Sequence, residues 1–356
     1  MTVIAVIPAT PDIAAAPTPF PLNQWYVAAL SPELKDKPVG RVLLNRSVVL
    51  FRTAVGQVSA LEDRCCHRAS ALSQGTLEGC GLRCGYHGLL YDGRGQCIEI
   101  PGQDKIPSRA KVKSYPVQER DGIVWIWFGT ELQPTPNSEA PSYTVHSSGK
   151  YVYDGGAVHY QAPYQLIHDN LLDLSHLGYV HLRTIGGNAK IHMNAQMKVE
   201  SDETSVKVVR HMPNSVPPPT YTSAYPFKGN VDRWQEIEFK VSHLLIWTGA
   251  VDVGTDSLED PDRGGFHLRG FHGVTPETET TSHYFWTIAT NPKKDMEAVK
   301  AKVVEQHALT FDEDKVVIEE QYKNILRHGP KPMIDIHVDA GANRARRIIE
   351  HLKASA

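Results

Sequence analysis

The alternation of hydrophobic and polar residues changes character near residue 130. Residues 40–61 alternate with a period of two and carry turn residues, which predicts β-hairpins, and the apolar run 122–128 predicts a buried strand. Between them, residues 63–102 are rich in glycine and cysteine and too interrupted for long regular elements. We therefore expect a small all-β domain over residues 23–130, preceded by a flexible, Pro-rich extension over residues 1–22.

The rest of the chain mixes helical and strand periodicity. Apolar spacing of three and four residues predicts helices over residues 164–178, 295–327 and 342–353. Strand-like segments lie between them, near residues 197–209, 234–241, 244–251, 265–274 and 282–289. After a Pro-rich linker over residues 130–141, we expect residues 131–356 to form an α+β domain of the helix-grip type, an antiparallel sheet covered by helices.

Composition and charge remove several classes of function. The formal net charge is -3 at pH 7, so the basic footprint of a nucleic-acid-binding protein is absent. No run approaches the roughly 18 apolar residues of a membrane span. The apolar N-terminus lacks the cationic start of an export signal. We therefore expect a cytoplasmic protein without structural disulfides.

All five cysteines fall between Cys65 and Cys97, which points to metal or redox chemistry. Two short loops each supply one thiol and one imidazole, Cys65 with His67 and Cys84 with His87. This set suits either zinc or a Rieske [2Fe–2S] cluster, in which two His replace two Cys on one iron. Zinc motifs usually pair like with like, so the mixed loops favour the cluster over zinc and over a purely structural role. The other three thiols are expected to be small buried side chains without a role, with a disulfide between two of them as the alternative: Cys66, Cys80 and Cys97.

A second polar group lies on the helix predicted after residue 164. Residues 151–182 carry seven Asp and His residues but no Lys or Arg. On a helix, four polar side chains would project within an arc of about 120°: Asp169, Asn170, Asp173 and His176. If a largely apolar helix buries this arc, the carboxylates require compensation, which a metal cation can supply. The alternative is a solvated acidic face with incidental histidines, and the absence of cations disfavours it.

His176 and His181 would diverge by about 140° on a regular helix. To bind one ion they require the helix to end or bulge between them, and Gly178 is the obvious position. Two His and one carboxylate with open positions form the facial triad of non-haem Fe(II) oxygenases.

The carboxylate of such a triad can come from two places. Asp314 borders an apolar stripe of the long helix, where a carboxylate requires a partner, whereas Glu313 and Glu320 are expected to point away. Asp173 competes through its proximity in sequence to the two histidines. The pattern alone leaves this choice open.

At these residues the chain resembles the oxygenase component of Rieske non-haem iron oxygenases. Within that family it is similar to the group of vanillate O-demethylase, dicamba O-demethylase and toluenesulfonate methyl-monooxygenase. The resemblance runs from residue 23 to residue 341. It depends on Asp-Arg-Cys-Cys-His-Arg at 63–68, Cys-Gly-Tyr-His-Gly at 84–88 and the motifs at 101–103, 169–176, 179–181, 275–279 and 313–315.

The resemblance implies two sets of ligands. The [2Fe–2S] cluster would be bound by Cys65, His67, Cys84 and His87. Mononuclear Fe(II) would be bound by His176, His181 and Asp314. The resemblance thereby selects Asp314 as the third ligand. It also implies that Asp173 links a mononuclear-iron His to a Rieske His of the neighbouring subunit in a head-to-tail homotrimer, with Asn170 next to the iron.

The implied function is that of the terminal oxygenase of an NAD(P)H-dependent monooxygenase acting with O2 on a small aromatic acid. The expected reaction is O-demethylation or methyl hydroxylation of an aryl carboxylate or sulfonate. No G-x-G-x-x-G opens a helix after a strand, so we expect a separate flavin and iron–sulfur reductase, with or without a ferredoxin, to use the NAD(P)H. The alternatives are a ring-hydroxylating oxygenase and a Rieske electron-transfer or iron-binding protein without oxygenase activity.

The pocket residues are the least defined part of this interpretation. By resemblance, His272 falls where dicamba O-demethylase has a substrate-contacting His, and Trp286 is a candidate for an aromatic wall. A core role is the alternative for both. The least family-like segments, 213–233 and 254–265, are expected to shape the pocket.

Overall fold

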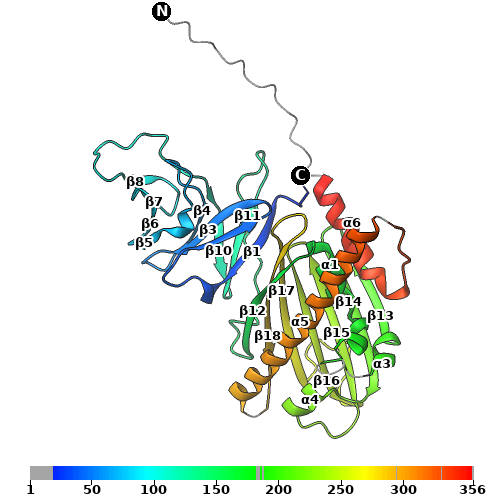
Figure 1. Cartoon of the computed structure of the whole chain (residues 1–356). Helices are drawn as coiled ribbons and strands as arrows, with labels where there is room; N and C mark the ends of the chain where they lie inside the picture. Colours follow the sequence, from blue (N-terminus) through cyan, green and yellow to red (C-terminus); the bar gives the residue numbers. More distant parts are fainter. Residues whose placement is uncertain (1–18, 182–184, 187, 294, 330, 355–356) are drawn as a thin grey trace, which may run out of the picture.

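The computed structural model describes residues 19–181, 185–186, 188–293, 295–329 and 331–354, which fold into an N-terminal all-β part and a larger helix-covered part (Figure 1). The described residues of the N-terminal part form three antiparallel sheets, ordered β1-β11-β10, β2-β3-β4-β9 and β5-β6-β7-β8. The strands are β1 (Gln24–Leu30), β2 (Val39–Leu43), β3 (Arg46–Arg52), β4 (Val58–Glu62), β5 (Thr76–Glu78), β6 (Gly81–Arg83), β7 (Leu90–Asp92), β8 (Cys97–Glu99), β9 (Ser114–Tyr115), β10 (Val117–Arg120) and β11 (Ile123–Phe128).

A single antiparallel sheet organises the larger part, with the order β12-β18-β17-β16-β15-β14-β13. Residues 129–151 hold no helix or strand and connect it to the N-terminal part. The strands are β12 (Val152–Tyr160), β13 (Gln196–Ser201), β14 (Val206–Ser215), β15 (Val231–Lys240), β16 (His243–Asp252), β17 (Phe266–Pro276) and β18 (Ser282–Thr290).

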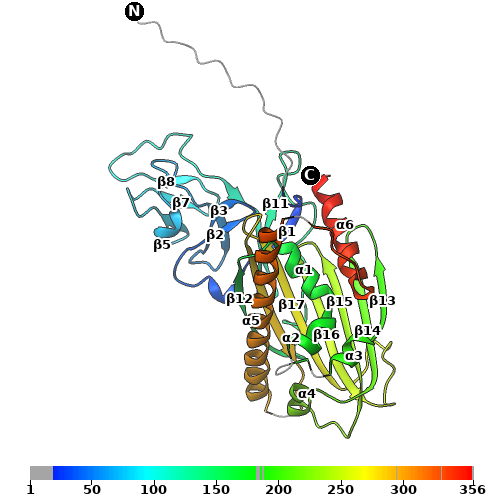
Figure 2. The ribbon, with the colours of Figure 1, turned by 45° about the vertical axis from the view of Figure 1, so that its right-hand side comes forward.

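Helices pack over one face of this sheet, as both views show (Figures 1 and 2). The long helix α5 contacts β12 and β18, α1 contacts β17, and α6 contacts β13 and β14. Their bounds are α1 (Tyr164–Leu172), α2 (Leu177–Val180), α3 (Ala189–Met193), α4 (Pro219–Ala224), α5 (Met296–His328) and α6 (Ala340–Ala354). Among the described residues, none of the helices is long and apolar enough to cross a membrane.

The opposite face of the sheet meets the N-terminal part. Trp125 of β11 packs against Phe271 of β17, with ring centroids 5.8 Å apart, and Phe285 of β18 belongs to the same buried cluster. The Thr275 hydroxyl donates a hydrogen bond to the Val27 carbonyl (2.7 Å). The two faces of one sheet therefore serve different purposes, domain packing on one side and the helix-covered interior on the other.

The expected α+β architecture, an all-β domain followed by an antiparallel sheet under helices, is confirmed. Two details are wrong. The strand expected over 197–209 is two strands, β13 and β14, because Asp202 turns the chain by accepting hydrogen bonds from the backbone N–H groups of Thr204 (2.7 Å) and Ser205 (2.8 Å). The sequence pattern also does not predict strand β12. The extension predicted over 1–22 lies largely outside the described residues, but Phe20 is 2% exposed and packs near Tyr164.

Candidate active site

The break that presents the two histidines lies at Asp173. Helix α1 ends because Asp173 is extended (φ -119°, ψ 94°), and its Oδ1 accepts a hydrogen bond from the backbone N–H of Ser175 (2.8 Å). A short 3-10 turn, η3 (Leu174–His176), follows and leads into α2. His176 and His181 thus flank α2 at its two ends.

The expectation that Gly178 interrupts the helix is wrong. Gly178 lies within α2, and its lack of a side chain serves packing instead. A Cβ there would lie 2.2 Å from the Cα of Ala189 at the start of α3. The close approach of α2 and α3 therefore requires glycine at this position.

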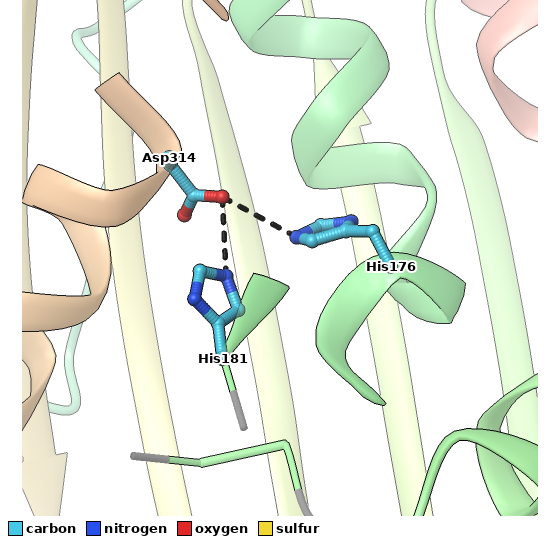
Figure 3. Close-up of side chains that lie close together, drawn as sticks. All are labelled: His176, His181 and Asp314. Atoms are coloured by element: carbon cyan, nitrogen blue, oxygen red, sulfur yellow. Dashed lines mark ion pairs between the residues drawn. The ribbon is translucent and has the colours of Figure 1, made fainter. Parts of the chain in front are cut away.

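Asp314 of α5 meets both histidines (Figure 3). Its Oδ1 lies 3.4 Å from His176 Nε2 and 3.1 Å from His181 Nε2. One potential ligand atom from each of the three residues lies within 4.8 Å of the others. Between the two carboxylates that the pattern left open, the structure brings Asp314 to the histidines.

Neighbouring groups hold the three side chains in place. The Asn170 amide donates a hydrogen bond to Asp314 Oδ1 (3.0 Å). The Nδ1 atoms of the two imidazoles are occupied, one by the Asp173 backbone carbonyl (2.6 Å) and the other by the Glu313 carboxylate (2.8 Å). This leaves both Nε2 atoms directed at the common point, the usual arrangement of imidazoles at metal sites. The expectation that Glu313 points away is wrong, and Asp173 contacts His176 through its backbone.

Burial and charge oppose each other at this cluster. Burial alone would raise the pKa of Asp314, but the two imidazoles outweigh it and lower that pKa to about 2. Burial would lower the pKa of His181, yet the Asp314 and Glu313 carboxylates raise it. Asp314 is therefore held as the carboxylate, which is the form that binds a cation.

The three side chains open onto a cavity under helices α1 and α5. Its walls are largely apolar, with Leu171, Leu177, Ile246, Leu268, Ile288 and Phe311. Its polar lining includes Asn170, Arg233, Gln235, Thr248, His272 and His307. A largely apolar lining with a few polar groups is typical of a small-molecule site.

Of the two pocket candidates, His272 lines this cavity and Trp286 does not. The His272 ring is buried and its Nδ1 is 2.6 Å from the Tyr284 hydroxyl. Burial lowers the pKa of His272 to about 3, so the ring is neutral near pH 7. Trp286 packs behind the wall against Phe311, with ring centroids 4.9 Å apart. It is a core residue.

The cavity also contains residues that the sequence interpretation missed. Segment 213–233 contributes Tyr221 and Arg233 to the lining, as expected of a pocket-shaping segment, whereas segment 254–265 contributes none of the described lining residues. From α5, His307 and Thr310 line the cavity in addition to the residues already named. Both lie on the helix face that Asp314 shares, at spacings of three and four residues, and that spacing could have revealed them.

In the N-terminal part, the two Cys–His loops have the same backbone design. Each cysteine N–H donates to the carbonyl five residues later, and each cysteine carbonyl accepts from the N–H four residues later. That fourth residue has positive φ in both loops, 56° at Ala69 and 75° at Gly88. The loops bring His67 and His87 together, with ring centroids 4.6 Å apart.

The donor set fits a [2Fe–2S] cluster with one buried and one exposed end. The Cys65 and Cys84 thiols are 2% exposed, whereas the two imidazoles are at the surface. The Tyr91 hydroxyl lies 3.1 Å from Cys65 Sγ. Of the three other thiols expected to be buried, only Cys97 is; Cys66 and Cys80 are exposed.

Comparison with known proteins defines the class of this chain. Residues 24–116 match the family profile described as Rieske [2Fe-2S] domain. Residues 160–355 match that described as Vanillate O-demethylase oxygenase C-terminal domain. A Rieske domain followed by a catalytic domain of this type defines the oxygenase component of a Rieske monooxygenase.

Whole-chain relatives narrow the class. The chain is 38% identical over 335 residues to a putative toluene-4-sulfonate monooxygenase system iron-sulfur subunit from Comamonas testosteroni, covering 93% of this chain and 96% of that protein. It is 33% identical to a vanillate O-demethylase oxygenase subunit from Pseudomonas sp. (strain HR199 / DSM 7063), covering 94% and 96%. The crystal structure of dicamba monooxygenase bound to dicamba superimposes with a TM-score of 0.85 at 33% identity, covering 94% and 98%.

The chain therefore belongs to the Rieske non-haem iron oxygenases, in the group with a vanillate O-demethylase type of C-terminal domain. Such oxygenase components work in multicomponent systems that depend on partner proteins for electrons.

Proposed function

We propose that this chain is the terminal oxygenase that inserts one atom of O2 into a C–H bond of a small aromatic acid. On an aryl methyl group the product is an alcohol. On an aryl methoxy group the product is a hemiacetal, which collapses to a phenol and formaldehyde. The second oxygen atom leaves as water, and NAD(P)H provides the two electrons through a separate flavin and iron–sulfur reductase.

One observation carries the proposal. His176, His181 and Asp314 converge at the edge of a mainly apolar cavity. An aromatic ring gains from the apolar walls, while its reacting group can lie next to the converging side chains.

The residues present fit the two iron groups of the family. Two imidazoles and one carboxylate would hold mononuclear Fe(II) and leave positions open, and Cys65, Cys84, His67 and His87 would hold the cluster. When bound, the iron would supply O2 activation and the cluster would supply electrons. The protein's own contribution is positional: Asn170 holds the Asp314 carboxylate, and the apolar walls exclude water.

We further propose a head-to-tail homotrimer in which the cluster of one subunit faces the mononuclear site of the next. The β5–β8 sheet, which adjoins the Cys–His loops, projects sideways away from helices α1 and α5 (Figures 1 and 2). A ring of such contacts closes by rotation. Asp173, next in sequence to η3, is the proposed link between the two centres.

The decisive experiment combines metal analysis with product analysis. Anaerobically purified protein should contain about three iron atoms per chain, two in the cluster and one at the triad. With NADH and a surrogate reductase, toluene-4-sulfonate, vanillate and dicamba should be tested, measuring O2 uptake, formaldehyde and the hydroxylated products. A product hydroxylated on the ring would instead identify a ring-hydroxylating oxygenase.

The variant His176→Ala separates an oxygenase from an electron carrier. We expect it to lose product formation while keeping the visible spectrum of the cluster, because His176 and the cluster loops lie on different domains. Undiminished activity of this variant would contradict the proposal.

A further inference from the structure

A buried arginine faces the same cavity as the triad. Along β15, residues at every second position are buried on the face that the helices cover, and Arg233 is in phase with Ile237 and Phe239. Its side chain is 3% exposed and lines the cavity. A guanidinium in this position is a permanent positive charge, because arginine does not lose its proton in proteins.

Arg233 has no anionic partner within the part of the chain that the structure describes. No carboxylate forms an ion pair with it, its Nε has no hydrogen-bond partner, and its guanidinium lies over the Tyr221 ring at 5.3 Å. A buried charge without a counter-charge is costly. Since this charge lines a cavity, a ligand can supply the missing anion.

The two other buried arginines among the described residues show the contrast. Arg263 forms an ion pair with Glu236 on the opposite face. Arg210, on the neighbouring strand, donates to the Gln235 side chain (3.1 Å) and to the backbone carbonyl of His192, and it does not line the cavity. Burial, reinforced by Arg233 and Arg210, lowers the pKa of His192 to about 4. The surroundings of Arg233 therefore favour an anion.

The cavity has two different ends. Arg233 pairs with Ala250 of β16, whereas Leu244 of β16 pairs with His272. Six residues along a strand correspond to roughly 20 Å between the two backbone positions. Next to Arg233 lie further polar groups, Gln235 and Thr248, whose side chains can complete an anion site.

We propose that Arg233 binds the acid group of the substrate and makes the enzyme selective for aryl carboxylates and sulfonates over their neutral analogues. The guanidinium fork binds two oxygens of such a group at once. The aromatic ring then lies along the apolar walls. This inference rests on the proposed function and assigns the anion to Arg233, whereas the neutral His272 ring serves the other end of the cavity.

The test compares charged and neutral members of a matched pair in wild-type and variant holoenzyme. The pairs are toluene-4-sulfonate with toluene-4-sulfonamide, and 4-methoxybenzoate with 4-methoxybenzamide. For Arg233→Met we expect KM for the anion to rise about 10- to 100-fold, the value of a charged hydrogen-bonded pair, while KM for the neutral partner changes little. Arg233→Lys, which keeps the charge but not the fork, should fall between the two. Equal changes for both members of a pair would overturn the inference.

Arg263→Met is the matched control, because it removes a buried guanidinium that lies on the opposite face of the sheet and does not line the cavity. We expect it to affect both members of a pair alike. Iron content and the cluster spectrum show whether each variant is correctly folded, and Arg233→Lys keeps the test available if Arg233→Met does not fold.

Calorimetric binding of toluene-4-sulfonate separates this inference from the proposed function. If wild-type protein binds the sulfonate without turnover and Arg233→Met does not bind it, the anion site stands and the proposed function fails. If Arg233→Met turns over the sulfonate with wild-type KM, the proposed function stands and the anion site fails.

Discussion

His168 of helix α1 is buried in the protein interior, and its two ring nitrogens make no hydrogen bonds with the described residues. Its side chain is 0% exposed, and both Nδ1 and Nε2 lack hydrogen-bond partners within the described residues. Aromatic edges surround it, with Tyr164 at 5.5 Å and Phe239 at 5.1 Å between ring centroids. Burial lowers the pKa of His168 to about 3.

This environment makes His168 a source of acid sensitivity. In the unfolded chain the imidazole takes up its proton near pH 6.5, whereas in the folded chain it stays neutral until the pH is much lower. The neutral, folded form is therefore favoured above about pH 6.5, and this contribution declines as the pH falls toward 3. Between pH 7.5 and pH 5.5 this one residue lowers the free energy of unfolding by about 1.4 kcal/mol.

The variant His168→Phe removes the titrating group and the two unsatisfied nitrogens while keeping an aromatic ring. A change of about 1.4 kcal/mol corresponds to ~3–6 °C in Tm for a domain of this size. We therefore expect the Tm of the variant to fall about 3–6 °C less than that of the wild type between pH 7.5 and pH 5.5, measured by scanning calorimetry.

Phe239→Leu is the control for this prediction. It perturbs the same cluster without removing a titrating group, so it should lower Tm by the same amount at both pH values. If the Tm of His168→Phe falls as much as that of the wild type between pH 7.5 and pH 5.5, His168 does not contribute to the acid sensitivity of the fold. That result would refute the reasoning.

Three further predictions concern the two iron sites. Gly178→Ala should lower triad iron below one atom per chain while leaving the cluster absorbance unchanged, because its Cβ would displace Ala189 and with it α2; retained triad iron would contradict this. Asp314→Ala should lose about one of three irons and all product formation, measured by metal analysis and turnover. Tyr91→Phe removes the hydroxyl 3.1 Å from Cys65 Sγ. It should lower the reduction potential of the cluster in a redox titration, because hydrogen bonds to the sulfur ligands raise it; an unchanged potential would exclude that contact.

The cluster loops could be predicted because their information is local. In each loop the cysteine and the histidine are two or three residues apart, so any compact turn brings them together. The third residue of the triad could not be predicted from the pattern. Asp314 is 133 residues beyond His181, and only the packing of α5 against the sheet brings the two side chains together.

Errors in the secondary structure have physical causes as well. Strand β12 lies at the edge of the sheet, and its pair Gly155-Gly156 interrupts the alternation that marks a strand. The sequence pattern favours Gly178 for the helix break because glycine is a weak helix former. Asp173 breaks the helix more effectively, because its side chain satisfies the N–H of Ser175 and thereby starts a new turn.

Arg233 shows what a sequence pattern can still offer at a functional site. In strand β15 the residues Ile237 and Phe239 fix the phase of the buried face, and the same phase continued backward places Arg233 inside. A charged residue at an inward position contradicts the local rule, and such contradictions gather where binding or catalysis outweighs stability. Conversely, His168 breaks the same rule without facing the cavity, and its consequence is acid sensitivity of the fold. The cavity, which only the tertiary structure reveals, is what distinguishes the two cases.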